Sequence, residues 1–249
     1  MEEISILTAG DSAVTVEFAD KISPLINRKV AAFSLALARE KIKGVSEFIP
    51  TFRSVTVFYD PLIISYGKLC AALQRIVENL EISSKEKKRV FKIPVCYEEP
   101  YAPDMHTVME HTGLDREQII ELHSGRDYLI YMLGFLPGFP YLGGMDERLE
   151  TPRLSSPRTK IEAGSVGIGG SQTGIYPLDS PGGWQLIGKT PVRVYDARRE
   201  DPIFYRAGDY IRFVPIGEAE YQRIQGLCDT GSYRCEVTET DGGDTEWTE

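Results

Sequence analysis

Two stretches decide the fold of this chain: GFLPGFPYLGG at Gly134–Gly144 and PRTKIEAGSVGIGGSQTGIYPLDSPGGWQLIG at Pro157–Gly188. From the first residue of one to the last of the other, the chain holds 12 of its 23 glycines. Glycine and proline are unfavourable inside helices, so no long helix is expected here. Aromatic and branched side chains recur throughout, which argues against low-complexity disorder. The pattern is typical of a closed β structure with tight turns, and we expect the functional site within it.

The whole chain of 249 residues is long enough for one large or two ordinary domains, and its 42% of hydrophobic residues can fill two cores. The net charge of −9 argues against a nucleic-acid partner and against an anionic membrane surface. No signal peptide precedes the first expected strand, and no apolar run approaches the roughly 18 residues of a membrane span. We therefore expect a cytoplasmic protein.

The cysteines and histidines do not have the spacing of a zinc site. The four cysteines are Cys70, Cys96, Cys228 and Cys235. No C-x-x-C pair occurs, and three histidines do not complete a ligand set. Buried, reduced cysteines and no bound metal are the simplest expectation.

The first 90 residues alternate between strand and helix patterns. Expected strands are Ala13–Phe18, Val45–Ile49, Ser54–Tyr59 and Val90–Tyr97. Expected helices begin at Ser23-Pro24, an N-cap followed by proline, and at Ser65. The order β-α-β-β-α-β predicts a ferredoxin-like α/β sandwich for residues 1–90.

Residues 91–216 have a different texture. Two short helices are expected at Asp104–Thr112 and Asp115–Ser124, and a buried strand at Tyr128–Phe135. The short strands expected after them are Ser165–Ile168, Thr173–Tyr176, Trp184–Gly188, Val192–Tyr195 and Tyr210–Val214. This pattern predicts an all-β, barrel-like domain.

Residues 217–249 are expected to form a terminal helix, over Glu218–Leu227, and an acidic tail. From Glu236 to Glu249 there are six acidic residues and no basic one. A solvated, poorly ordered end is the simplest interpretation.

Gly183–Thr190 matches the phosphate-loop pattern G-x-x-x-x-G-K-[ST]. That loop requires a strand before it and a helix after it, so that amides and the helix dipole meet the phosphates. Here Pro181-Gly182 precedes the match, and Pro191 with an alternating strand pattern follows it. We predict that the match binds no nucleotide.

His123 lies where an expected helix ends, beside Ser124-Gly125. It can hydrogen-bond at the helix end as a structural residue, or act as a general base; both interpretations remain open. Arg153 and Arg158 can pair with an anionic substrate, although surface arginines are usually only solvated. Exposed amides among the glycines can form a nest for a carboxylate or an oxyanion.

Several motifs, in this order, resemble one known family. They are Gly10-Asp-Ser-Ala13, Glu17-Phe18, Ile93-Pro-Val-Cys-Tyr97, Pro103-Asp104, Leu122-His-Ser124, Tyr131-Met-Leu-Gly-Phe135, Pro137-Gly-Phe-Pro-Tyr-Leu-Gly-Gly144, Pro157-Arg-Thr159, Ala163-Gly-Ser-Val-Gly167, Gln172-Thr-Gly-Ile-Tyr-Pro177 and Ser180-Pro-Gly-Gly-Trp184. Over residues 5 to about 216 the chain resembles the small subunit of bacterial 5-oxoprolinase, a family that includes allophanate hydrolase subunit 1 and Kip-type inhibitors of a sporulation kinase. It departs from the family at Glu98-Glu99-Pro100 and at Ser171, which leaves the details of an amide nest open.

The resemblance implies a cyclophilin-like β-barrel in the second domain and a role in a complex. The partners would be a homologous large subunit and a third lactam-utilisation subunit, and the complex would open 5-oxo-L-proline to L-glutamate with ATP and Mg²⁺. Two alternatives remain: inhibition of a sensor histidine kinase, and a carboxyltransferase or allophanate hydrolase-type role in urea metabolism. The small subunit alone is expected to be inactive.

Residue type and loop context nominate the site residues. The catalytic candidates are His123, Arg158, Gln172, Thr173 and Tyr176. The binding candidates are Phe135, Pro137, Gly138, Phe139, Pro140, Tyr141, Gly164, Ser165, Gly174, Ser180, Gly182, Gly183 and Trp184.

Overall fold

The structure is a computed structural model that describes residues 4–82 and 88–240. The described residues form two compact units, residues 4–82 and residues 88–240. Each unit has its own hydrophobic core and is described by itself.

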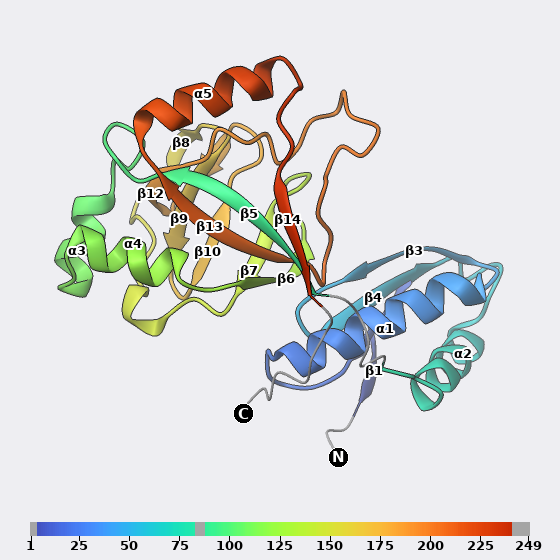
Figure 1. Cartoon of the computed structure of the whole chain (residues 1–249). Coiled ribbons are helices and arrows are strands. Elements are labelled where there is room, and N and C mark those ends of the chain that lie inside the picture. Colours follow the sequence, from blue (N-terminus) through green and yellow to red (C-terminus); the bar gives the residue numbers. More distant parts are fainter. Residues whose placement is uncertain (1–3, 83–87, 241–249) are drawn as a thin grey trace. The chain divides into compact units, whose positions relative to one another are not determined.

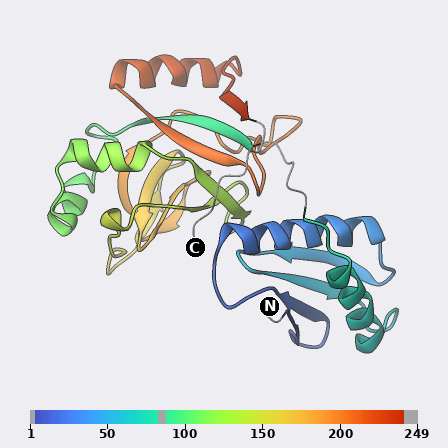
Figure 2. The same ribbon diagram turned by 60° about the horizontal axis from the view of Figure 1, so that its bottom comes forward.

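The N-terminal unit is a four-stranded antiparallel sheet with two helices. Its elements are β1 (Ser5–Thr8), β2 (Ala13–Glu17), α1 (Pro24–Glu40), β3 (Val45–Pro50), β4 (Ser54–Tyr59) and α2 (Tyr66–Glu78). The Ser23 hydroxyl accepts a hydrogen bond from the Ile26 amide at 3.2 Å, so α1 begins at the predicted cap. Figure 2 shows α1 lying along the sheet. Alternate residues of β2 and β4, such as Val16 and Val57, pack with Phe33 and Leu73 in one core.

The predicted ferredoxin-like order of this unit is not confirmed. The strand order is β1-β2-β4-β3, so β2, β3 and β4 form the expected split β-α-β arrangement. The fourth position, beside β2, is filled by β1, which the sequence pattern did not predict. Val90–Tyr97, predicted as the last strand of this sheet, belongs instead to the second unit.

The second unit is built on an eight-stranded sheet that nearly closes into a barrel (Figure 1). Its strands are β5 (Lys88–Cys96), β6 (Tyr128–Leu133), β7 (Pro140–Gly143), β9 (Ser165–Gly169), β10 (Gln172–Ile175), β12 (Gln185–Lys189), β13 (Tyr210–Ile216) and β14 (Glu236–Thr240). The order is β10-β9-β12-β5-β13-β6-β7, with β14 also paired to β5. β10 and β7, at opposite ends of this order, approach closely: a Cβ on Gly174 would lie 3.2 Å from the Pro140 carbonyl oxygen.

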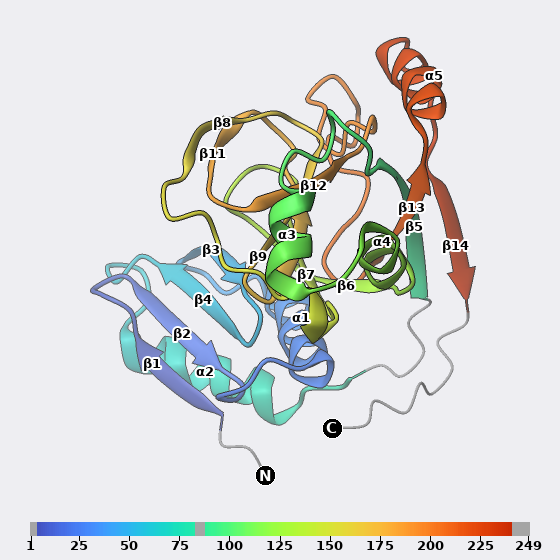
Figure 3. The same cartoon turned by 90° about the vertical axis from the view of Figure 1, so that its left-hand side faces the viewer.

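Helices and a short ribbon cover the barrel. The helical elements are α3 (Met105–Thr112), α4 (Arg116–Ser124), the 3₁₀ turn η1 (Glu147–Leu149) and α5 (Glu218–Asp229), and the ribbon pairs β8 (Arg158–Ile161) with β11 (Ser180–Gly182). α3 and α4 contribute Met105 and Ile119 to the barrel core. Figure 3 shows these two helices on the same side of the unit. Asp115 caps α4 in the predicted capping box with Gln118.

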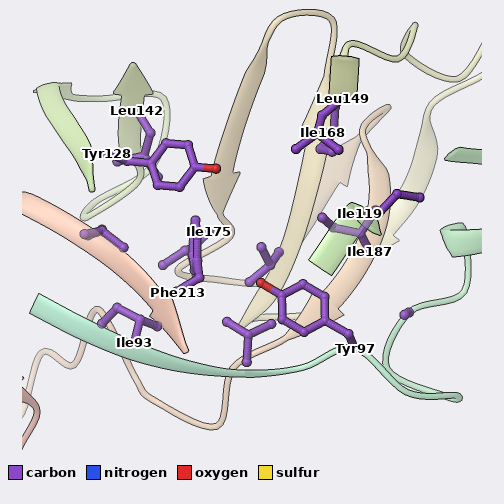
Figure 4. Packing of buried hydrophobic residues seen from close by; sticks show 14 of the residues in the cluster. Ile93, Tyr97, Ile119, Tyr128, Leu142, Leu149, Ile168, Ile175, Ile187 and Phe213 are labelled. Carbon is purple, nitrogen blue, oxygen red and sulfur yellow. The ribbon is translucent and has the colours of Figure 1, made fainter. Parts of the chain in front are cut away.

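The barrel interior holds the larger core of the unit. Figure 4 shows side chains from β5, β9, β10, β12 and β13 converging there, with Tyr97, Tyr128 and Phe213 among the largest. Inward residues alternate with outward ones along β9, where Val166 and Ile168 belong to the core.

The end of the described chain corrects the expected acidic tail. The predicted terminal helix is present as α5, but residues 236–240 are not a free end: they form β14, antiparallel to β5 (Figure 3). Glu236 forms an ion pair with Lys92 at 2.5 Å, which offsets part of the acidic charge. The rest of the predicted tail, residues 241–249, lies outside the described residues.

One predicted strand is absent and another is shorter. Val192–Tyr195 forms no strand; only Tyr195 makes an isolated bridge, to Ile203. The alternating pattern reflects burial within a loop, because Val192 and Val194 are both buried. β6 ends at Leu133, before the predicted end at Phe135.

Two kinds of feature are absent from the described part of the chain. Within residues 4–82 and 88–240, no helix has both the length and the apolar character needed to cross a membrane. In the same residues, no three His, Cys, Asp or Glu side chains gather as metal ligands would.

Candidate functional site

A small aromatic cluster on the outer face of the barrel brings together the predicted binding residues Phe139 and Trp184 and the catalytic candidate Tyr176. It consists of Phe139, Ile161, Tyr176, Trp184 and Leu186 and is separate from the barrel core. Neighbouring residues of the same segments, Ile175 and Ile187, face the interior instead. The cluster is thus a second, external core.

Trp184 is seated on glycines. A Cβ on Gly169 would lie only 2.4 Å from the indole Nε1 of Trp184, and one on Gly174 would lie 3.2 Å from the same ring. The amides of Gly167, Gly169 and Gly174 lie in the paired β9–β10 ladder. These glycines therefore make room for the indole ring, and the predicted nest of exposed amides is not formed on β9–β10.

Phe139 is the centre of the aromatic contacts. Its ring meets those of Phe135, Tyr141, Tyr176 and Trp184 edge to face, with centroids 5.4–5.7 Å apart. This is the geometry that aromatic quadrupoles favour. The loop from Gly134 to Phe139 is therefore fixed to the barrel by a buried ring.

Phe135 is held in a rare backbone conformation. Its φ is +62°, and the Leu136 amide donates to the Gly134 carbonyl at 2.7 Å across it. A three-residue turn with a positive central φ is strained for any residue with a side chain. The Phe135 side chain is nevertheless 65% exposed.

The two arginines of the site differ in their bonding. Arg158 donates to the Asp104 carboxylate at 2.6 Å, and the other oxygen of Asp104 accepts from the Leu186 amide at 2.7 Å. Arg158 is thereby committed to a half-buried ion pair that links β8, β12 and the start of α3. Arg153 is exposed and lies over the Trp184 ring at 5.8 Å.

Tyr176 is nearly fully buried in the external cluster. Burial raises the pKa of its hydroxyl above the ordinary value, and the positive charge of Arg153 opposes that shift. The hydroxyl therefore stays protonated near neutral pH and can donate but not act as a base. Gln172, at the first position of β10, is partly exposed and paired to Gly169.

His123 and Thr173 lie inside the barrel, away from the external cluster. His123 is fully buried; its Nε2 lies 2.8 Å from Thr173 Oγ1 and its Nδ1 lies 2.7 Å from the Tyr97 hydroxyl. Thr173 donates its one proton to the Gly167 carbonyl at 3.0 Å. Nε2 must then donate to Thr173, and Nδ1 accepts from Tyr97, which assigns a neutral tautomer.

The electrostatics of His123 agree with that assignment. Burial, aided by the positive charge of the nearby Arg126, lowers its pKa to about 3. The ring stacks on Phe213 with centroids 4.4 Å apart. This placement fits the structural interpretation of His123, because both nitrogens are engaged and the side chain is closed off from solvent.

The remaining predicted residues are dispersed around the barrel. Gly138 and Pro140 are buried with Phe139, whereas Pro137 is exposed beside Phe135. Gly182 packs against the Tyr176 ring and Gly183 against Pro157. Gly164 and Ser165 lie at the start of β9, where the Gly164 amide donates to the Tyr176 carbonyl at 2.7 Å. The Ser180 hydroxyl is buried and has no hydrogen-bond partner among the described residues.

The match to the phosphate-loop pattern does not fit a nucleotide. Gln185–Lys189 is strand β12, as predicted, and its amides face neighbouring strands. The Lys189 ammonium is paired with Glu162. We therefore assign no ATP contact to this segment.

Three residues that hold the site together were not predicted for it. Asp104 was expected as a helix start and as part of the motif Pro103-Asp104 of the resemblance, but its buried carboxylate was not anticipated. Tyr205 donates to the Gly138 carbonyl at 2.7 Å, and Tyr97 fixes His123. The available signal for Tyr97 was its place within a motif of the resemblance, whereas Tyr205 lies in no such motif.

A shallow depression of about 390 Å³ lies elsewhere, in the N-terminal unit. It is bordered by the end of α1, including Leu37 and Lys41, and by Val45–Phe48 of β3. None of the predicted site residues lies there.

The fold and the site define an α+β protein with a barrel-like unit that displays a rigid aromatic loop. The chain belongs to the family described as carboxyltransferase domain, subdomain C and D, whose model matches residues 4–205.

Two relatives are 41% identical to this chain, and both are named as subunits of 5-oxoprolinase. One is from Bacillus subtilis (strain 168), and the match covers 85% of this chain and 92% of that protein. The other is from Escherichia coli O157:H7, and the match covers 88% of this chain and 99% of that protein.

Two solved structures are also similar. A conserved uncharacterized protein from Pyrococcus horikoshii is 44% identical with a TM-score of 0.52, over 87% of this chain and 100% of that chain. The protein TTHA0988 is 37% identical with a TM-score of 0.72, over 82% of this chain. This chain spans only 40% of the length of TTHA0988.

Proposed function

We propose that this chain is the small subunit of an ATP-dependent 5-oxoprolinase, which opens the lactam of 5-oxo-L-proline to L-glutamate. The observation that carries the proposal is 41% identity, over nearly their full lengths, to 5-oxoprolinase subunits from two bacteria. A homologous large subunit and a third lactam-utilisation subunit complete the proposed complex.

The chain is proposed to be inactive alone. In the external cluster, Tyr176 keeps its proton and Arg158 is already paired with Asp104. His123, the one histidine among the catalytic candidates, is sealed inside the barrel. These groups provide no accessible base near neutral pH, which supports a reaction centre completed by a partner.

The proposed roles follow from these placements. Gln172 and the exposed Arg153 orient substrate or partner at the surface. Tyr176 packs in the external cluster and holds Trp184 in place. Arg158 positions Trp184 and β12 through its ion pair with Asp104. His123 and Thr173 act only through the packing of the barrel. ATP and Mg²⁺ are proposed for the complex, and no step is assigned to them in this chain.

The experiment is co-expression with the cognate large and third subunits, followed by an assay of glutamate release from 5-oxoproline. Release is expected only when ATP, Mg²⁺ and this chain are all present. Equal release from the partners without this chain would contradict the proposal, as would activity of this chain alone.

The family description favours one second candidate, a carboxyltransferase. In that case, this chain and a partner would transfer a carboxyl group from carboxybiotin to urea. The same purified complex, supplied with a biotin carboxylase and urea, separates the two functions by its product.

A further inference from the structure

We propose that Phe135 is the anchor with which this chain binds the large subunit of its complex, inserting into an apolar pocket of that subunit. This inference rests on the proposed function. It is carried by the conformation, the support and the exposure of one residue.

The conformation of Phe135 is unfavourable in the free chain. Its φ is +62°, and a residue with a bulky side chain rarely adopts a positive φ. Among the described residues that are not glycine, only Lys41 shares a positive φ, and Lys41 ends helix α1, where that conformation is common. Strain of this kind persists when the surroundings impose it, and it concentrates at functional sites.

The loop around Phe135 imposes that conformation. The Gly134 amide donates to the Phe139 carbonyl at 3.2 Å, and the Phe139 amide donates to the Leu136 carbonyl at 3.0 Å. The Gly138 carbonyl accepts from the buried Tyr205 hydroxyl at 2.7 Å. A Cβ on Gly138 would meet the Tyr195 side chain at 3.3 Å, and its φ is +83°, so glycine is required there.

The two phenylalanines of the loop differ in their exposure to solvent. Phe139 is 3% exposed and fills the external cluster, whereas Phe135, 65% exposed, touches Phe139 only edge to face. The backbone is therefore strained at a residue whose aromatic ring faces solvent. A rigid aromatic side chain loses little entropy on binding, which is the property of residues that dominate interfaces.

Two exposed residues, one in the Phe135 loop and one over the external cluster, indicate the chemistry of the partner surface. Pro137 is exposed in the same loop, and Arg153 is exposed over Trp184 without an ion pair to any described residue. The matching surface is an apolar pocket with a carboxylate at its rim. In TTHA0988 the matched region is 40% of the chain, so in that protein the same fold is joined to a larger remainder.

Calorimetry of the full-length chain with the purified large subunit measures the proposed contact. Phe135→Ala is expected to raise the Kd at least about 10-fold, the effect of an interface hot spot. Phe135→Tyr keeps the ring and is expected to bind within a few-fold of the wild type. Leu62→Ala is the control, because Leu62 is 95% exposed in the N-terminal unit, and its Kd is expected to be unchanged.

Phe135→Gly separates docking from a structural role. Glycine accepts a positive φ, so the free variant is expected to unfold at the same or a higher temperature than the wild type while its Kd rises. A lower unfolding temperature with an unchanged Kd would overturn the proposal. So would an equal loss of binding in Leu62→Ala, or a Phe135→Ala chain that binds normally.

Two further measurements show whether Phe135 binds something other than the large subunit. If Phe135→Ala raises the KM for 5-oxoproline at an unchanged Kd for the large subunit, Phe135 contacts substrate and the proposal fails. If it only abolishes self-association or inhibition of a histidine kinase, the occupant is another protein and the proposal also fails. Tight, Phe135-dependent binding without glutamate release would retain the docking site and refute the proposed reaction.

Discussion

Trp184 shows how far single residues can be interpreted from sequence. The density of glycine and aromatic residues predicted a site in this segment, and the structure brings Phe139, Tyr176 and Trp184 together in one cluster. Gly169 and Gly174 make room for the indole ring, and their amides lie in the β9–β10 pair where a nest of exposed amides was expected. Which glycine faces which ring depends on strand register, and register is not written in any local motif.

Gly169→Ala and Gly226→Ala test this packing as a pair. A Cβ on Gly169 would lie 2.4 Å from the rigid Trp184 indole, so we expect a loss of about 1–3 kcal/mol in the free energy of unfolding. Gly226 lies in α5 with open space around it, so alanine there should add roughly 0.5–1 kcal/mol through helix propensity. Urea denaturation measures the free energy of unfolding of both variants. Equal changes would contradict the close contact between Gly169 and the Trp184 ring.

His123 gives a pH prediction with a defined sign. Its pKa is about 3 in the folded chain and ordinarily about 6.5, so the unfolded chain takes up the proton first as the pH falls. The stability it contributes above pH 6.5 is lost as the pH falls toward 3. Compared with His123→Gln, the wild type should lose up to about 1.4 kcal/mol more per pH unit in this range.

The measurement is urea denaturation of both proteins between pH 7.5 and pH 4. At pH 7.5 the variant itself should be destabilised by about 1–3 kcal/mol, because Tyr97 or Thr173 loses a partner. Parallel pH profiles would show that His123 is not buried as a neutral ring. Loss of activity without any loss of stability would restore the catalytic interpretation.

Helices and most strands could be predicted because their signals are local. The Ser23 cap, the Asp115 capping box and the alternation of β2 and β4 all lie within a few residues. The prediction that β5 belongs to the N-terminal sheet was wrong, because a strand pattern does not show which strand it pairs with. β14 was missed because its exposed, acidic residues bury nothing and are ordered only by pairing with β5.

Deleting residues 236–249 tests the role of β14. Every residue of β14 is exposed, so the barrel core should survive the deletion and the chain should remain folded. Amide exchange should accelerate along Lys88–Lys92, which β14 covers, while β13 keeps its protection. Hydrogen exchange by mass spectrometry distinguishes this local effect from global unfolding, which would show that β14 is essential to the core.

Each of the two units has its own main core, and the hydrophobic content of the chain is enough for two. Phe18, Phe33 and Leu69 fill the N-terminal core, while Tyr128 and Phe213 belong to the barrel. A function could not be inferred from either core, because packing residues serve any chemistry. It came from the family motifs and from relatives that match nearly the whole chain.

Residues 1–86 should therefore fold when expressed alone. Their core draws only on their own elements, β1 to β4 with α1 and α2. Circular dichroism should show helix and strand, with one cooperative thermal transition. A fragment that is unfolded at 25 °C would show that this unit depends on the remainder of the chain.

The most direct test of the proposed function is a stoichiometric titration of a fixed amount of the partner subunits with this chain. ATP-dependent glutamate release from 5-oxoproline is followed at each ratio. The rate is expected to rise from the background and saturate at a fixed molar ratio, and Phe135→Ala is expected to shift the titration to higher concentrations. A rate that does not depend on this chain would contradict its role as a subunit of a 5-oxoprolinase.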